Sequence, residues 1–122
     1  MLLIDDDDRV RKTVALMLQA FGHEVREADS GITGLRQFDA DRPDLVITDI
    51  IMPDMEGVET ISEIKRLNPS MKIIAMSGGG RIKNTDFLKL AKSAGAAATL
   101  NKPFDDDELA AAIDAVTQRQ VS

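Results

Sequence analysis

Short apolar runs alternate along this chain with longer segments in which apolar residues recur every three or four positions. The clearest run, from Leu45 to Asp49, is aliphatic or β-branched until it ends on a carboxylate. Such runs are typical of strands buried on both faces of a parallel sheet, and the longer spacing is typical of helices. The predicted strands are 2–4, 24–28, 45–49, 72–77 and 97–101.

Helices are predicted between and after these strands. Asp7 or Asp8 is expected to cap the first helix and Ser30 the second, because their side-chain oxygens can accept the first free backbone amides. Asp105 and Glu108 form a capping-box pattern before the last helix. The predicted buried stripes are Val10, Val14, Met17, Leu18 and Phe21; Ile32, Leu35 and Phe38; Val58, Ile61, Ile64 and Leu67; Phe87, Leu90, Ala91 and Ala94; and Leu109, Ala112, Ile113 and Val116.

Five strands alternating with five helices predict right-handed βαβ crossovers, and therefore an α/β fold with a doubly wound parallel sheet between two helical layers. The 122 residues, 43% of them hydrophobic, are enough for one core and too few for two ordinary domains. We therefore expect a single domain that covers residues 1–122.

Composition narrows the classes of function. The chain has no cysteine, which excludes disulfides, thiolate metal sites and cysteine nucleophiles. A formal charge of −6, from 21 acidic and 15 basic residues, disfavours nonspecific binding to nucleic acid or to anionic membranes. No apolar stretch approaches the roughly 20 residues of a membrane span, and the N-terminus lacks the apolar region of a signal peptide. We expect a cytoplasmic protein that binds neither nucleic acid nor membrane through this domain.

Polar side chains follow four of the predicted strands where each strand ends. Asp5 and Asp6 follow the first strand, Asp49 ends the third, Ser77 ends the fourth and Lys102 follows the fifth. Ligands of open α/β sheets bind outside the carboxyl ends of the strands, so these five side chains are expected to share one shallow cleft.

Three neighbouring carboxylates repel one another unless a cation lies between them. An oxygen-only ligand set favours Mg²⁺ over zinc, and Mg²⁺ commonly bridges carboxylates to a phosphoryl oxygen. Phosphoryl transfer to Asp49 as nucleophile fits this inventory, with Lys102 and the Ser77 hydroxyl neutralising charge on the phosphoryl oxygens. No residue is placed as a strong general base for a hydrolytic water, so the aspartyl phosphate is expected to persist.

Each of these residues also has an ordinary structural interpretation. Asp7 and Asp8 are more simply explained as solvated caps, and Ser77 or Lys102 alone would be a turn residue or a surface cation. His23, after the first helix, is better explained as a surface or boundary residue than as a ligand. The functional interpretation rests on the joint placement of the residues at the strand ends.

The chain resembles the receiver domain of two-component response regulators along essentially its whole length. That resemblance implies the strand order 2-1-3-4-5, as in the flavodoxin-like folds. The matching motifs are Leu3–Asp7, Thr48–Pro53 with Gly57, Met76–Gly78 and Asn101–Phe104.

The resemblance assigns a role to each matching residue. It makes Asp49 the phosphoacceptor and Asp6 a direct Mg²⁺ ligand, with Asp5 acting mostly through a bound water and the backbone carbonyl of Ile51 supplying a further ligand. The phosphoryl donor would be a sensor histidine kinase or a histidine phosphotransfer protein, and the output partner is unknown. Lys102 would contact the phosphoryl group.

Two further features follow from the resemblance. Ser77 stands where the family has its switch serine or threonine, and the Lys102–Pro103 bond is expected to be cis. The sequence departs from the family at Thr99, where a tyrosine or phenylalanine is usual, so the movement of that ring is missing from the relay. The fifth strand and the face of the fourth helix also lack the acidic pair of receivers that dimerise through the fourth helix, fifth strand and fifth helix, so that dimer is not supported.

Two other functions remain open on the sequence. A small Mg²⁺-dependent phosphohydrolase of the haloacid dehalogenase type also uses an aspartyl nucleophile, but on its first strand. Here Arg9 breaks that pattern after Asp5–Asp8, and the chain has no room for a substrate cap. A binding module that no longer uses phosphate is suggested by Thr99.

Overall fold

The computed structural model describes residues 1–50, 56–77 and 85–117, which contain five strands and five helices in alternation. The predicted elements are confirmed to within a few residues at each end. In chain order they are β1 (Leu2–Ile4), α1 (Asp8–Ala20), β2 (Arg26–Ala28), α2 (Gly31–Ala40), β3 (Val46–Asp49), α3 (Glu56–Leu67), β4 (Ile73–Ser77), α4 (Thr85–Ala94), β5 (Ala98–Asn101) and α5 (Asp106–Thr117).

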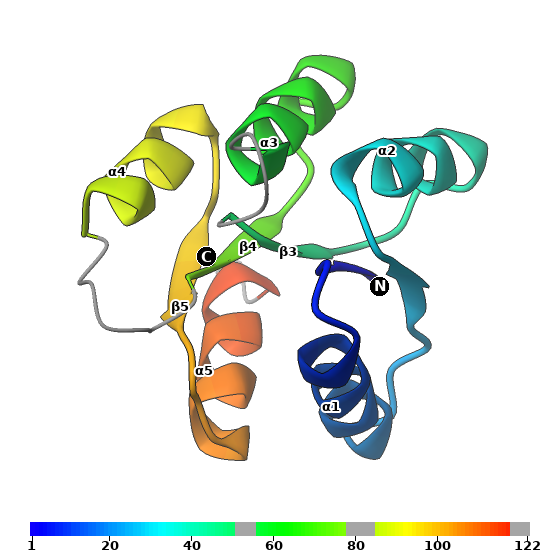
Figure 1. Cartoon of the computed structure of the whole chain (residues 1–122), viewed down its shortest axis with the longest axis vertical. Helices are drawn as coiled ribbons and strands as arrows, with labels where there is room; N and C mark the ends of the chain where they lie inside the picture. Colours follow the sequence, from blue (N-terminus) through cyan, green and yellow to red (C-terminus); the bar gives the residue numbers. More distant parts are fainter. Residues whose placement is uncertain (51–55, 78–84, 118–122) are drawn as a thin grey trace.

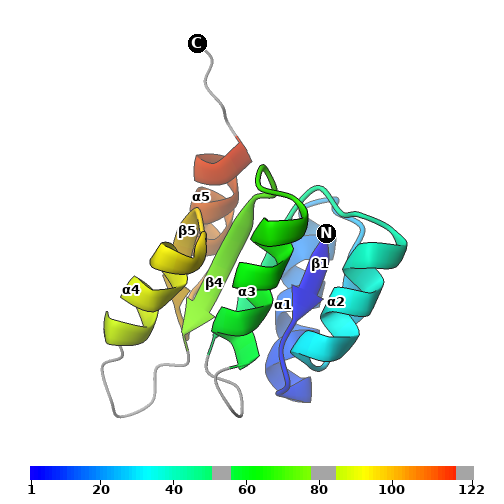
Figure 2. The ribbon, with the colours of Figure 1, turned by 90° about the horizontal axis from the view of Figure 1, so that it is seen from above.

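The five strands form one parallel sheet in the order β2-β1-β3-β4-β5, which confirms the predicted doubly wound α/β fold. Helices α1 and α5 cover one face, and α2, α3 and α4 cover the other (Figures 1 and 2). Because all strands run in the same direction, their carboxyl ends share one edge of the sheet, and β1, β3, β4 and β5 all end there.

The core is divided into two layers by the sheet. Strand side chains alternate between the layers, so Leu2 and Ile4 face α2 and α3, whereas Leu3 faces α1 and α5. The same alternation places Val46 in the first layer and Ile47 in the second. All five are fully buried, as expected for strands covered on both faces.

Helix ends follow the predicted side-chain caps. Asp7 caps α1 by accepting the amides of Arg9 and Val10, and Ser30 caps α2 in the same way. Asp105 and Glu108 accept one another's backbone amides at 2.8 and 3.0 Å, which confirms the capping box before α5.

Four predicted stripe residues are wrong, because Ile32, Leu90, Phe21 and Leu67, the last residue of α3, are exposed. In α2 the buried face is set by Gly34, where a Cβ atom would overlap the side chain of Ile4. That close approach turns Ile32 to solvent. In α4 the small Ala91 faces the core and its neighbour Leu90 points away, whereas Phe21 lies past the last residue of α1.

The second strand is shorter than predicted. It begins at Arg26 instead of Glu24, because β1 offers only three residues to pair with and Arg26 is the partner of Leu2. The side chain of Phe87 and the three glycines at 78–80 lie outside the described residues. Within the described segments, no helix is long and apolar enough to cross a membrane.

Candidate functional site

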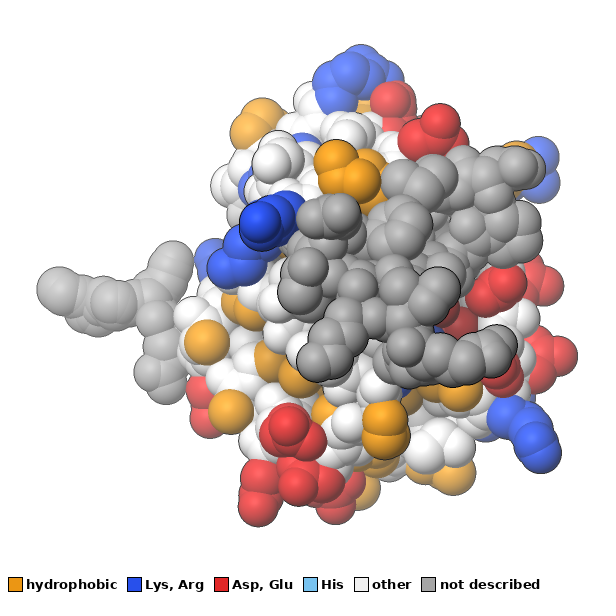
Figure 3. Space-filling view, turned by 60° about the vertical axis from the view of Figure 1, so that its left-hand side comes forward, with side chains coloured by type: hydrophobic (Ala, Val, Ile, Leu, Met, Phe, Trp, Pro, Cys, Tyr) orange, Lys and Arg blue, Asp and Glu red, His pale blue; other side chains and the backbone are white. Residues whose placement is uncertain are grey.

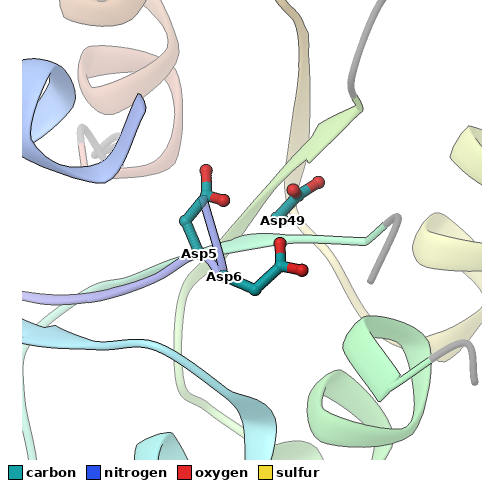
Figure 4. Close-up of side chains that lie close together, drawn as sticks. All are labelled: Asp5, Asp6 and Asp49. Carbon is teal, nitrogen blue, oxygen red and sulfur yellow. The ribbon is translucent and has the colours of Figure 1, made fainter. Parts of the chain in front are cut away.

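Three carboxylates gather at the carboxyl edge of the sheet, where β1 and β3 end side by side. Asp5 and Asp6 follow β1, and Asp49 is the last residue of β3, whose Thr48 pairs with Ile4. One oxygen atom from each of the three carboxylates lies within 4.8 Å of the others (Figure 4). The parallel register therefore brings together acids that are more than 40 positions apart in the sequence.

The three acids differ in exposure and in their contacts. Asp5 is fully buried and Asp49 is 4% exposed, whereas Asp6 is open to solvent. Both oxygens of Asp5 accept hydrogen bonds, one from the backbone amide of Asp7 at 2.9 Å and the other from the Lys102 ammonium at 3.0 Å. Asp6 is therefore the acid of the group that is most open to an incoming ligand.

Lys102, which follows the edge strand β5, brings a positive charge to the two buried acids, Asp5 and Asp49. Its ammonium donates to Asp5 and, at 3.1 Å, to Asp49. Burial lowers the pKa of Lys102, but the charges of Asp49 and Asp5 and the hydrogen bonds to both outweigh burial and raise the pKa above its ordinary value. The lysine is therefore charged at neutral pH.

A backbone hydrogen bond to β4 holds the chain at Lys102 in place. The amide of Lys102 donates to the carbonyl of Ser77 at 2.8 Å, and the Lys102–Pro103 bond is cis, as the resemblance implies. Ser77, the last residue of β4, is 2% exposed and pairs with Asn101 in the sheet. The structure thus brings Ser77 and Lys102 to the edge that carries Asp5, Asp6 and Asp49.

Close packing holds the end of β3 in place. At Gly57, in the first turn of α3, a Cβ atom would overlap the carbonyl oxygen of Asp49 and the backbone of Ile50. That carbonyl also accepts the hydroxyl of Thr48 at 3.0 Å. A residue with a side chain at position 57 would push α3 away from Asp49, which gives a physical reason for the glycine in the matching motif.

The residues fit a hard divalent cation. All the side chains in the acidic group are carboxylates, and there are three of them against the single ammonium of Lys102. Oxygen ligands of this kind suit Mg²⁺ better than zinc. Within the described parts of the chain, no other group of three acidic or histidine side chains lies close enough to hold an ion. Ile51, the fourth ligand implied by the resemblance, lies outside the described residues.

Sequence reasoning missed Arg11. This α1 residue is 9% exposed, and its guanidinium donates to the backbone carbonyl of Asp5 at 2.8 Å. It also pairs with Asp8 at 2.7 Å and Glu27 at 3.0 Å. Burial lowers the Arg11 pKa, but the bonds to Asp8 and Glu27 outweigh burial and raise it.

A sequence signal for Arg11 does exist. The buried residues of α1 are Arg11, Val14, Ala15 and Leu18, which follow the spacing of a single helical face. A charged residue at the first position of a buried stripe needs partners, so it marks a contact beyond its own helix.

Comparison with known proteins identifies the family. A family model described as the response regulator receiver domain matches residues 1–114. The chain is 37% identical over 114 residues to the transcriptional regulatory protein GlrR of Escherichia coli K12, a match that covers 93% of this chain and 25% of GlrR. It is 30% identical over 112 residues to sporulation initiation phosphotransferase F of Bacillus subtilis, covering 92% of this chain and 88% of that protein.

Solved structures agree with these relatives. The receiver domain of NtrX from Brucella abortus superposes with a TM-score of 0.86 at 30% identity, and the match covers 97% of this chain and 98% of that domain. The chain spans only about a quarter of GlrR and 23% of the NtrC protein of Azospirillum brasilense. The likeness to these longer regulators therefore concerns one part of each.

Proposed function

The chain belongs to the response regulator receiver domain family, whose members are phosphoacceptor switches of two-component systems rather than enzymes, and we propose that Asp49 is its phosphoacceptor. The observation that carries this proposal is the placement of Asp49. Its carboxylate is almost fully buried, lies at the carboxyl end of a central strand and contacts the ammonium of Lys102, which lies 53 positions further along the sequence.

We propose that Asp6 and Asp49 hold Mg²⁺ directly and that Asp5 acts through a bound water. Support comes from the contacts of Asp5, because both of its oxygens already accept hydrogen bonds. Asp6 is exposed and close to Asp49, and among the described residues no hydrogen bond or ion pair holds its carboxylate, so it can reach an ion. When bound, Mg²⁺ would neutralise charge on a phosphoryl oxygen.

In the proposed reaction, an oxygen of the Asp49 carboxylate forms a bond to phosphorus while the bond from phosphorus to the donor nitrogen or acyl oxygen breaks. The donor group leaves with the electron pair of that bond. Lys102 already lies beside Asp49, so its charge can stabilise the phosphoryl oxygens without rearrangement of the chain. Ser77 ends the neighbouring strand, and we propose that its hydroxyl contacts the phosphoryl group.

Receiver domains are phosphorylated by histidine kinases, and we propose a sensor histidine kinase or a histidine phosphotransfer protein as the donor to this chain. We propose that residues 1–122 form one receiver domain and that phosphorylation changes its affinity for an output partner. A coupling free energy of about 1–3 kcal/mol is typical of such switches.

Treatment with a small acyl phosphate and Mg²⁺ tests the acceptor. Intact-mass spectrometry should show one addition of about 80 Da, the mass of a phosphoryl group. Asp49→Asn should remove the addition, because an amide is not a nucleophile of this kind. Asp44→Asn is the matched control, since Asp44 lies just before the other end of β3 and is exposed. Equal labelling of Asp49→Asn and wild type would refute the assignment.

Thr99 keeps a second candidate function open, that of a binding module that does not depend on phosphate. The residue is half-buried on β5 and pairs with Ala75, so no aromatic ring is available there to move with the switch. A partner affinity that is the same for wild type, phosphorylated wild type and Asp49→Asn would favour this second function.

A further inference from the structure

The loop from β1 to α1 presents one acid to solvent and holds the other in the core. The amide of Asp5 donates to Ala28 at 3.1 Å, and its carboxylate is bound by Asp7 and Lys102. Its remaining backbone group is the carbonyl, which accepts the guanidinium of Arg11. Every polar group of Asp5 is therefore bound by a different part of the fold.

We propose that Arg11 is a positioning residue for the metal site, because it fixes the peptide plane that joins Asp5 to Asp6. This inference rests on the proposed function, since it concerns the proposed ligand Asp6. A peptide group is planar, so the Asp5 carbonyl and the Asp6 amide turn together. A donor that holds the carbonyl therefore restricts the direction in which Asp6 leaves the end of β1.

Arg11 is suited to this task by its shape and its surroundings. Its guanidinium donates in three directions, to the Asp5 carbonyl, to Glu27 on β2 and to Asp8 on its own helix. A planar fork of donors can hold three acceptors at once, which a single ammonium group holds less well. The side chain thus ties β1, β2 and α1 together directly behind the acidic group.

Electrostatics and positioning predict opposite effects when Arg11 loses its charge. Arg11 is a cation close to a site proposed for another cation, so removing its charge alone should strengthen Mg²⁺ binding. Releasing the Asp5 carbonyl should weaken Mg²⁺ binding, because Asp6 then samples orientations that do not reach the ion. The sign of the change therefore separates the two effects.

The experiment compares Arg11→Gln with Lys12→Gln by calorimetric titration of the apo proteins with Mg²⁺. Lys12 is the matched control, because it is the next cation on α1 and contacts the same Glu27, at 3.4 Å, yet is 67% exposed. We expect Arg11→Gln to lose about 10-fold in Mg²⁺ affinity, as is typical when a group that orients a metal ligand is removed. Lys12→Gln should stay within about twofold of wild type or bind more tightly.

Phosphorylation kinetics give a second readout that loss of stability alone would not produce. For Arg11→Gln, the Mg²⁺ concentration that gives half the maximal labelling rate should rise about 10-fold, while the rate at saturating Mg²⁺ stays close to that of wild type. Circular dichroism at the assay temperature confirms that each variant is folded. If Arg11→Gln does not fold, Arg11→Lys carries the test, since it keeps the charge and is expected to weaken Mg²⁺ binding by a smaller factor.

Three outcomes would overturn the inference. Mg²⁺ affinity in the folded arginine variant that equals or exceeds the wild-type value would show that the carbonyl contact does not position Asp6. Equal losses in Arg11→Gln and Lys12→Gln would assign the effect to Glu27 instead. A wild-type protein that binds no Mg²⁺ would refute the proposed metal site itself, and with it this inference.

Discussion

Two runs of four acidic residues stand near the two ends of this chain, and the fold uses them differently. Asp5–Asp8 follows the buried strand β1, whereas Asp105–Glu108 forms the cap and first turn of α5 and lies in solvent. Acidic side chains gather at the lower edge of the face in Figure 3, at the level where Figure 1 places the start of α5. Both runs cap a helix, but only the first meets a carboxylate from another strand and a distant lysine.

The difference teaches that acidic composition does not define the site. In the second run, Asp105 and Glu108 satisfy one another's backbone amides, and their charges lie in water, where mutual repulsion is weak. In the first run, Asp5 is fully buried beside Asp49, and this arrangement is stable only with Lys102 or another cation between them. Burial of like charges from different strands is the feature that points to a ligand.

The largest expected effect comes from replacing Lys102, which contacts Asp5 of the first acidic run. Lys102→Met should slow phosphorylation by a small acyl phosphate about 10²- to 10³-fold, because one preorganised charge on the phosphoryl oxygens is lost. It should also lower the free energy of unfolding by about 3 kcal/mol, since Asp5 stays buried without its ammonium partner. Time-resolved mass spectrometry and urea unfolding measure the two effects. A labelling rate within threefold of wild type would contradict this role.

The raised pKa of Lys102 makes the stability effect depend on pH. Its folded-state pKa lies above the unfolded value of about 10.4, so the stability from its ion pairs is fully present below that pH and is lost as the pH rises through the folded-state pKa. The difference in unfolding free energy between wild type and Lys102→Met should be constant from about pH 7 to pH 10 and shrink above that range. A difference that persists unchanged at higher pH would show that it does not come from these ion pairs.

A smaller effect separates the two acidic runs directly. Asp6→Asn should weaken Mg²⁺ binding at least about 10-fold, because a charged ligand becomes a neutral one. Asp106→Asn removes the same charge from the exposed run and should leave Mg²⁺ binding and phosphorylation unchanged. Calorimetric titration of both proteins measures this contrast. Comparable losses in the two variants would mean that overall negative charge, and not the site, governs Mg²⁺ affinity.

The smallest expected effect is one that the two runs share. Asp7→Ala and Asp105→Ala each remove a helix cap and should lower the free energy of unfolding by about 1 kcal/mol. Mg²⁺ binding should survive both changes, because the contact of Asp7 with Asp5 is made by its backbone amide. Urea unfolding and titration test the pair. A strong loss of Mg²⁺ binding in Asp7→Ala alone would make that cap part of the site.

Local patterns in the sequence determined most of this fold. The apolar runs fixed the strands, the caps Asp7 and Ser30 fixed two helix starts, and alternation of the elements fixed a parallel sheet with one functional edge. These predictions depend on neighbours within a few residues, where geometry is set by the backbone itself. The residues brought to that edge were predictable for the same reason, since each one ends a strand or lies just after its end.

Only the tertiary structure decided which contacts these residues make. Lys102 donates hydrogen bonds to Asp5 and Asp49, which lie 97 and 53 positions away in the sequence. Arg11 donates to the carbonyl of Asp5 from α1, whose predicted buried stripe contained only apolar residues. Exposure of Ile32 depended in turn on how closely α2 packs on β1. Such distances follow from how the helices pack on the sheet, and packing is settled by the whole chain at once rather than by any segment of the sequence.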